Sequence, residues 1–163
     1  MKVIFLDVDG VLNCQSSKSR CGAFIGIDAD KVKRLRKIVE ATGAKIILTS
    51  TWKLHWTRDP YLKDEQGESG DYLDRKLRRE RLFIMDKTTR EKSLSHRGEG
   101  IYNYLQNHNV ESWIVLDDEV FKDFEEYGIM PHLVKTSFYS DNGGIQDEHV
   151  KLAIALLNTE QND

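Results

Sequence analysis

This sequence is poor in cysteine and has neither an internal repeat nor a low-complexity segment. Its 163 residues include only two cysteines, Cys14 and Cys21, both in one short loop. A disulfide between them is compatible with this spacing, but two free thiols in a reducing cytoplasm are the stronger expectation. A single Cys-x6-Cys pair without nearby histidines is also a weak zinc site. The cysteines therefore indicate neither a disulfide scaffold nor a zinc domain.

Long apolar runs are missing too. No segment approaches the length of a membrane-spanning helix, so we expect no association with a membrane. The first expected strand begins at Lys2, which leaves no room for a signal peptide before it, and we expect a cytoplasmic protein. With 39% hydrophobic and 31% charged residues, a chain of this length predicts one domain over residues 1–163 with a core of its own.

Charge of one sign is not in large excess. The 24 Lys and Arg residues and 27 Asp and Glu residues give a net charge of −3, which provides no general attraction to nucleic acid. The distribution is uneven, because a basic stretch contains Arg75, Lys76, Arg78, Arg79, Arg81, Lys87, Arg90, Lys92 and Arg97. Such a stretch is typical of a solvated helix face. Alternatively, it attracts a polyanionic substrate such as a nucleic acid end. No obligate protein partner is evident.

Short apolar segments alternate with amphipathic ones along the whole chain. Strands are expected at residues 2–6, of which 3–6 are apolar, and at residues 45–48, 82–85, 112–116 and 132–135. Helices are expected at residues 27–41, 72–81, 99–107 and 146–157, the first with Asp28 as its N-cap. The alternation predicts right-handed βαβ units, and therefore a three-layer, Rossmann-like α/β fold with a central parallel sheet of about five strands.

Two carboxylates directly follow the first apolar segment, in the string Asp7-Val8-Asp9-Gly10. Alternate side chains of an extended chain share a side, so Asp7 and Asp9 can converge on one point. Two like charges forced together require a counter-ion, and a hard cation such as Mg²⁺ suits carboxylate oxygens. Gly10 permits a sharp turn out of the strand. The alternative is an ordinary acidic turn, since Asp and Gly are common turn residues.

Other polar side chains follow two more of the expected strands. Thr49 and Ser50 come after residues 45–48, and Asp117 and Asp118 come after residues 112–116. Sites in open α/β sheets form outside the carboxyl ends of the strands. We therefore expect these side chains to meet Asp7 at one edge of the sheet.

The string around Asp7 resembles the first motif of the haloacid dehalogenase (HAD) superfamily. The resemblance implies that Asp7 is the nucleophile of a phosphoryl transfer and Asp9 the general acid/base. Dehalogenase members lack the second Asp, whereas phosphatases carry it. The resemblance thus implies a HAD-type phosphatase that forms an aspartyl-phosphate and uses Mg²⁺ as its cofactor.

The remaining motifs of the superfamily also have counterparts. A Thr or Ser that binds a phosphate oxygen corresponds to Thr49, or to Ser50 in a register one residue later. A basic residue at a helix start, which also holds the phosphate, corresponds to Arg97, with Lys92 as the alternative. A lone hydroxyl or a lone arginine at these places is by itself unremarkable.

The acidic pair Asp117-Asp118 resembles the fourth motif, which binds the metal. The resemblance implies that Asp118 is a direct ligand and that Asp117 orients the basic residue or a metal-bound water. Asp123, five positions after Asp118, is a further candidate acid. The full metal set implied is Asp7, Asp9, Asp117 and Asp118.

The chain is most similar to the small HAD domains of Swiss-army-knife RNA-repair proteins. The similarity is carried by Thr49-Ser-Thr-Trp-Lys53, by Arg97-Gly98 and by the acidic pair, and it extends from Lys2 to about Leu157. Lys53 replaces the more usual Arg, which puts a specific role for that residue in doubt. The short flap loop at 14–27 and the modest insertion at 52–70 leave no room for a large cap domain.

An open site suits a phosphate carried by a large substrate. Four residues of the second insertion could stack on a base or pack their loop onto the core: Trp52, His55, Trp56 and Tyr61. We expect a Mg²⁺-dependent phosphohydrolase whose partner is a phosphorylated substrate, a nucleotide or a nucleic acid end. The alternatives are a phosphatase of small metabolites or phosphoproteins, and a HAD-like binding module without turnover.

Overall fold

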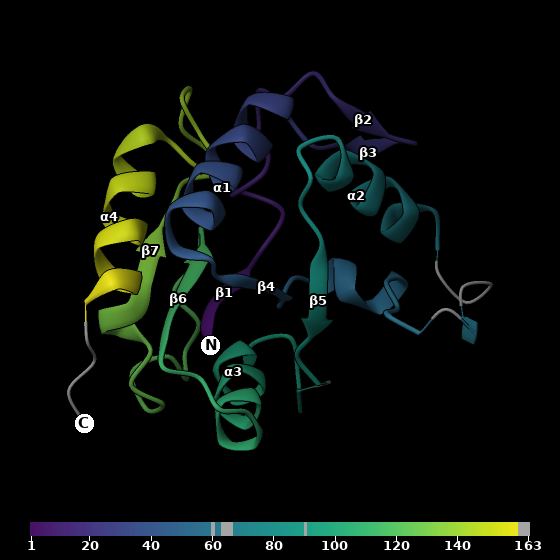
Figure 1. Cartoon of the computed structure of the whole chain (residues 1–163). Helices are drawn as coiled ribbons and strands as arrows, with labels where there is room; N and C mark the ends of the chain where they lie inside the picture. Colours follow the sequence, from purple (N-terminus) through teal and green to yellow (C-terminus); the bar gives the residue numbers. More distant parts are fainter. Residues whose placement is uncertain (60, 63–66, 90, 160–163) are drawn as a thin grey trace.

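The chain folds around one five-stranded parallel sheet. The computed structural model describes residues 1–59, 61–62, 67–89 and 91–159 (Figure 1). The strand order is β5-β4-β1-β6-β7. The strands are β1 (Lys2–Leu6), β4 (Lys45–Leu48), β5 (Ile84–Lys87), β6 (Ser112–Asp117) and β7 (Leu133–Lys135). The predicted α/β fold with a parallel sheet of about five strands is confirmed.

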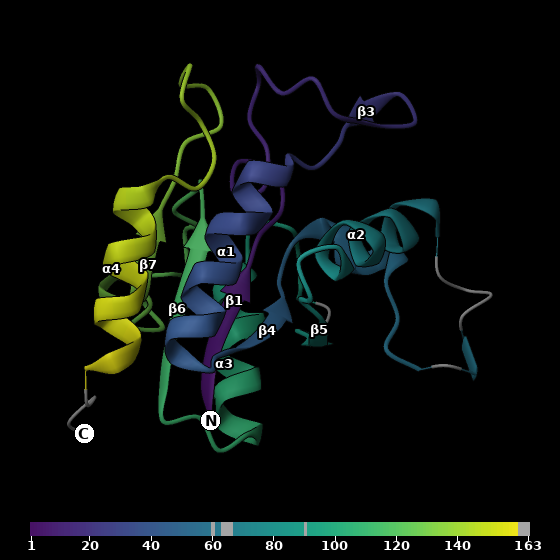
Figure 2. The same ribbon diagram turned by 45° about the horizontal axis from the view of Figure 1, so that its top comes forward.

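Alternate residues of β1 face opposite sides of the sheet, as expected of a strand buried on both faces. Ile4 and Leu6 belong to the core cluster under α1 (Ala29–Thr42) and α4 (Asp147–Asn158). Val3 and Phe5 belong to the cluster under α3 (Arg97–Asn107). Figures 1 and 2 show α1 and α4 next to each other on one face, with α3 on the other. The three layers follow from this alternation.

The segment around α2 (Glu68–Arg78) differs from the expectation. The helix begins four residues earlier than predicted, with Gly67 as N-cap and two acidic residues in its first turn, where they favour the helix dipole. It also ends earlier, because Arg81 has a left-handed φ of 57° and the Leu82 N–H donates to the carbonyl of Leu77. Leu82 is therefore buried at the helix end, and β5 begins two residues later than predicted.

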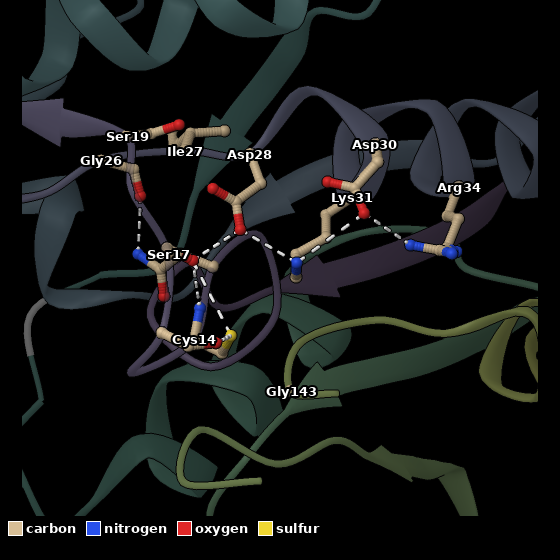
Figure 3. Close-up of polar contacts among 12 residues, drawn as sticks. Cys14, Ser17, Ser19, Gly26, Ile27, Asp28, Asp30, Lys31, Arg34 and Gly143 are labelled. Carbon is tan, nitrogen blue, oxygen red and sulfur yellow. Dashed lines mark hydrogen bonds and ion pairs between the residues drawn. The ribbon is translucent and has the colours of Figure 1, made fainter. Parts of the chain in front are cut away.

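Asp28 stands at the N-cap position of α1, but its side chain does not cap the helix. Its carboxylate instead accepts a hydrogen bond from Ser17 Oγ (2.5 Å) and pairs with Lys31 Nζ (2.9 Å), as Figure 3 shows. The predicted N-cap position is confirmed, but the carboxylate is used in a charge-assisted pair, which is stronger than a cap bond to a backbone N–H. These contacts fasten the loop at 14–27 to the start of α1.

Only small elements lie outside the layers. The loop at 14–27 contains a hairpin of β2 (Arg20–Cys21) and β3 (Phe24–Ile25), and the 3-10 helix η1 (Thr51–His55) follows β4. A second 3-10 helix, η3 (Met130–His132), leads into β7. The absence of a large cap is confirmed, although residues 60 and 63–66 of the 52–70 insertion lie outside the described ranges.

The cysteines and the helix lengths can be compared with the predictions from the sequence. Cys14 and Cys21 are both free and buried, so the chain has no disulfide. Within the described residues, no helix combines the length and the apolar character that crossing a membrane would require.

Candidate active site at the carboxyl edge of the sheet

The ends of the three central strands place the candidate residues side by side. Leu6 pairs with both Leu48 and Leu116, so the residues that follow these strands are neighbours. The Asp7 N–H donates to the carbonyl of Leu116 at 3.0 Å, and the Thr49 N–H donates to the carbonyl of Leu6 at 2.9 Å. The sheet order reverses at β1, which is where α/β folds place their ligands.

Three carboxylates meet at this edge. Ligand atoms of Asp7, Asp117 and Asp118 lie within 4.8 Å of one another. Asp7 and Asp117 are buried, and Asp118 is half-buried. A cavity of about 330 Å³, here called the acid cavity, is lined by these acids together with Asp9, Thr51, Leu94, Arg97, Glu119, Phe121, Phe138 and Tyr139.

The acids are short of positive charge. Burial, reinforced by the charge of Asp117, raises the pKa of Asp7 well above its usual value. The same two causes raise the pKa of Asp118 to about 6. Three hard oxygen donors at such close range fit a divalent cation such as Mg²⁺, which would offset their repulsion.

Arg97 is the cation that the fold itself supplies. Its Nη1 lies 3.0 Å from Asp7 Oδ1 and 2.7 Å from Asp117 Oδ2, and its guanidinium stacks on the ring of Phe121 at 4.4 Å. Burial works against the charged form, but the two carboxylates outweigh it and raise the pKa of Arg97. Lys92, by contrast, is exposed, and its backbone N–H donates to Glu99. The geometry thus favours Arg97 for the predicted role.

Asp123 holds the helix start from which Arg97 projects. Its two carboxylate oxygens accept hydrogen bonds from the backbone N–H groups of Gly98 (3.0 Å) and Glu99 (2.9 Å). These are the first free donors of α3, so Asp123 caps the helix from a distant loop. It does not belong to the group of three acids, and its role is to position Arg97.

Asp9 does not belong to the group of three acids whose ligand atoms lie within 4.8 Å of one another. Its Oδ1 accepts a hydrogen bond from Asn13 Nδ2 (2.8 Å), and its Oδ2 accepts one from Trp52 Nε1 (3.1 Å). β1 ends at Leu6 and the chain then turns rather than continuing extended, which places the Asp9 carboxylate against Asn13 and Trp52. Asp7 and Asp9 both line the acid cavity, so a ligand in this cavity could contact both carboxylates.

Gly10 makes this turn possible. Its φ of +85° is a conformation that side chains disfavour. A Cβ at this position would also lie 2.3 Å from Cγ of Asp118. The glycine is therefore required for the close approach of the turn to the acidic pair.

The two hydroxyls after β4 have different surroundings. Ser50 Oγ accepts a hydrogen bond from the Trp52 N–H and caps η1. Thr49 Oγ1 is buried and has no hydrogen-bond partner within the described part of the chain. It lines a small cavity of about 160 Å³ to which Arg97 also contributes. A buried hydroxyl without a partner is costly, so this contrast favours Thr49 as the phosphate ligand.

The other predicted residues divide into structural and exposed ones. Lys53 is buried and donates to Thr88 Oγ1, the Thr89 carbonyl and Glu91, so it holds the segment after β5. Trp56 packs against the core and donates to Asp74, whereas Trp52 and His55 line a cavity and Tyr61 is exposed. In the basic stretch Arg75, Arg78, Arg79 and Arg81 are exposed, and Arg90 lies outside the described residues.

Two further residues of the site, Asn13 and Thr136, belong to none of the sequence motifs. Asn13 joins the turn to the hairpin: its Oδ1 accepts from the Gly10 N–H and its Nδ2 donates to Asp9 and to the carbonyl of Gly26. Thr136, after β7, donates to the carbonyl of Gly10 at 2.5 Å. The only sequence signal for them is their position in loops that follow strands.

Fold and site together define the class. An aspartate after the first strand, a hydroxyl after the second, an arginine at a helix start and an acidic pair after the fourth strand are the arrangement of HAD-type hydrolases. The family model for the HAD domain in Swiss Army Knife RNA repair proteins matches residues 3–150, and the chain belongs to this family. The predicted resemblance is therefore confirmed. Comparisons with curated proteins and with solved structures found no match.

Proposed function

We propose that this protein is a Mg²⁺-dependent phosphohydrolase that removes a terminal phosphate from a nucleotide or a nucleic acid end. The observation that carries the proposal is the buried Asp7 carboxylate, held at 3.0 Å by Arg97 beside two further acids. A carboxylate can act as a nucleophile toward phosphorus when cations surround the phosphate. Arg97 and the hydroxyl of Thr49, which has no hydrogen-bond partner among the described residues, lie where they could bind phosphate oxygens.

The reaction would proceed in two displacements. A free oxygen of Asp7 attacks phosphorus, the bond to the leaving oxygen breaks, and Asp9 gives that oxygen a proton. The product is an aspartyl-phosphate on Asp7 and an alcohol. Asp9 then removes a proton from a water that attacks the phosphorus, and the bond to Asp7 breaks, releasing inorganic phosphate. Asp7, Asp117 and Asp118 would hold Mg²⁺, which when bound neutralises charge on the phosphate.

Two features support a nucleic acid end over a small metabolite. The site has no large cap, so a bulky substrate has access. The aromatic side chains of Trp52, Phe24 and Phe138 line a cavity that also includes Asp9, and aromatic rings are what nucleobases stack on. A phosphatase of small metabolites or phosphoproteins remains the alternative within the class, and a binding module without turnover is the alternative outside it.

The test is phosphate release in the presence of Mg²⁺. The substrates are p-nitrophenyl phosphate, nucleoside monophosphates, and oligonucleotides with a 3′- or 5′-phosphate, each assayed with wild type and Asp7→Asn. We expect turnover that the substitution lowers by roughly a thousandfold or more, as loss of a nucleophile does. Turnover that survives in folded Asp7→Asn would contradict the aspartyl-phosphate mechanism. Folded wild type that binds Mg²⁺ without releasing phosphate would favour the binding module.

A further inference from the structure

A second cavity adjoins the acid cavity and differs from it in chemistry. It has a volume of about 590 Å³, within the usual range for small-molecule sites. Its walls include the side chains of Phe24, Trp52, Leu54, His55 and Phe138, with Asp9 at one side. We call it the aromatic pocket. Phe24 and Leu54 are 77% and 60% exposed, so large apolar side chains stand uncovered at its rim.

The aromatic pocket shares part of its wall with the acid cavity. Asp9, Thr51 and Phe138 line both. A hydrogen bond also connects the two cavities, because the indole N–H of Trp52 donates to Asp9 Oδ2 at 3.1 Å. In the proposed reaction Asp9 protonates the leaving oxygen. A leaving group attached to that oxygen therefore has the aromatic pocket directly beside it.

The walls of the pocket are held in place by polar contacts. The hairpin β2–β3 is closed at its base by a hydrogen bond from the Gly26 N–H to the carbonyl of Ser19 (2.8 Å). The Ile27 N–H donates to the Tyr72 hydroxyl of α2 (3.0 Å), and the Tyr72 ring lies 6.3 Å from that of Trp52. Hairpin, α2 and η1 thus form one assembly. A pocket that is formed before binding loses less conformational entropy when a ligand enters.

Positive charge lies next to this assembly rather than in the pocket. Among the described residues, the pocket lining includes neither Lys nor Arg. Arg75 and Lys76 of α2 instead lie 5.8 and 5.5 Å from the Tyr72 ring, which supports the hairpin. An uncharged planar ring suits the pocket, and further phosphates suit the neighbouring cations. Both belong to a nucleic acid strand.

We propose that the aromatic pocket binds the base of the nucleotide that carries the scissile phosphate, and that the protein therefore acts on ends whose terminal base is unpaired. This inference rests on the proposed phosphohydrolase function. A base that is paired and stacked at a duplex end must first leave the stack, which costs free energy, whereas a single-stranded end offers its base directly. Phe24, Trp52 and Phe138 are the residues that recognise it.

The test compares oligonucleotides that differ only at the terminal residue. Single strands with a terminal phosphate carry either a normal base or an abasic sugar, and a third set is paired into blunt duplexes. KM and kcat are measured for wild type, for Phe24→Ala and for the control Phe83→Ala, a phenylalanine that is also largely exposed, at 69%, but does not line the pocket. Both substitutions change surface side chains, so folding should be preserved.

We expect Phe24→Ala to raise KM about tenfold for the base-ended single strand, which is the effect of losing one stacking contact. The abasic end should be unaffected by Phe24→Ala, and Phe83→Ala should change neither substrate. Duplex ends should react about tenfold more slowly than single-stranded ends. Equal effects of Phe24→Ala on base-ended and abasic strands would overturn the inference. So would equal rates on duplex and single-stranded ends, or a clear preference for a phosphotyrosine peptide.

Binding separates this inference from the proposed function. Affinities of Asp7→Asn for the same labelled strands, measured by fluorescence anisotropy with Mg²⁺, do not depend on turnover. Base-dependent binding, without phosphate release by wild type from any substrate, would support the pocket and refute the hydrolase. Asp7-dependent hydrolysis of p-nitrophenyl phosphate, together with binding that ignores the terminal base, would support the hydrolase and overturn the pocket.

Discussion

The acid cavity and the aromatic pocket meet at Asp9 but are built from different parts of the molecule. Asp7 and Asp117 stand at the ends of paired central strands, and Arg97 is the first residue of a core helix. The aromatic pocket is made mainly by η1, the hairpin and Phe138 of the segment after β7, which lie in connections between core elements. One site is thus part of the sheet, and the other is attached to it.

This difference separates chemistry from recognition. Strand register holds the acids, so they cannot move without disturbing the core. The pocket depends on loop residues, several of them exposed, which can change without cost to the sheet. A fold that keeps one reaction while changing its substrates needs this division.

The largest expected effect concerns the only cation that contacts the acids among the described residues. Arg97→Met leaves two buried carboxylates without their partner, which typically costs about 3–5 kcal/mol of unfolding free energy. Urea denaturation measures this. Arg34→Met is the control, because Arg34 pairs with the exposed Asp30 and Asp147, and such pairs are worth at most about 1 kcal/mol. If both variants lost the same unfolding free energy, Arg97 would not be the cation that stabilises the buried acids.

Gly10→Ala should disturb the acid cavity through the backbone. We expect a loss of about 2 kcal/mol or more, from the left-handed φ and from overlap with Asp118. Gly43→Ala has a similar φ of +70° but no atom within 4 Å among the described neighbours, so it should cost only about 1 kcal/mol. Thermal unfolding compares the two. Weakened Mg²⁺ binding should accompany the first substitution alone.

Thr49→Val should move stability and activity in opposite directions. The buried Thr49 hydroxyl has no partner in the described part of the chain, so its removal should raise the unfolding free energy by about 1 kcal/mol, while phosphate release falls about tenfold. The comparison variant is Thr42→Val, whose hydroxyl donates to the Ile38 carbonyl at 2.7 Å and whose loss should destabilise the protein. A destabilised Thr49→Val with full activity would exclude a phosphate-binding role.

Mg²⁺ affinity should fall with decreasing pH, because the ligands must be ionised. With the pKa of Asp118 at about 6 and that of Asp7 also raised, protons compete with the metal, and affinity should drop at least about tenfold between pH 7 and pH 5. The stability of the metal-free protein should instead rise as the pH falls. A carboxyl whose pKa is raised by folding adds stability as pH falls through about 6. Calorimetric titration measures the Mg²⁺ affinity at each pH, and thermal unfolding measures the stability of the metal-free protein. A Mg²⁺ affinity that does not change between pH 7 and pH 5 would contradict the role of Asp118 as a ligand.

The smallest effect is expected at the boundary between the two cavities. Trp52→Phe keeps an aromatic wall but removes the N–H that donates to Asp9, so kcat should fall about fivefold while KM for a base-ended strand stays nearly constant. Trp56→Phe removes the corresponding bond to Asp74 and should affect only stability. A Trp52→Phe variant with a changed KM and an unchanged kcat would assign the residue to recognition alone.

Much of this arrangement could be predicted from particular residues. The apolar strand before Asp7 and the acidic pair after residues 112–116 indicated both the parallel sheet and the edge at which its polar residues meet. That inference succeeds because parallel strands necessarily place their carboxyl ends together. The helix at 68–78 was located less well, because its first turn is polar and its burial depends on residues far away in the sequence.

The α/β fold, the family and the edge of the sheet where the acids gather can all be derived from the sequence, because they follow from local pattern and strand direction. How individual side chains are used depends on the three-dimensional packing. Trp52 orients Asp9 across 43 positions, and Asp123 caps the helix of Arg97 from 25 positions beyond Gly98. Such contacts depend on packing between distant segments, and no local pattern encodes them.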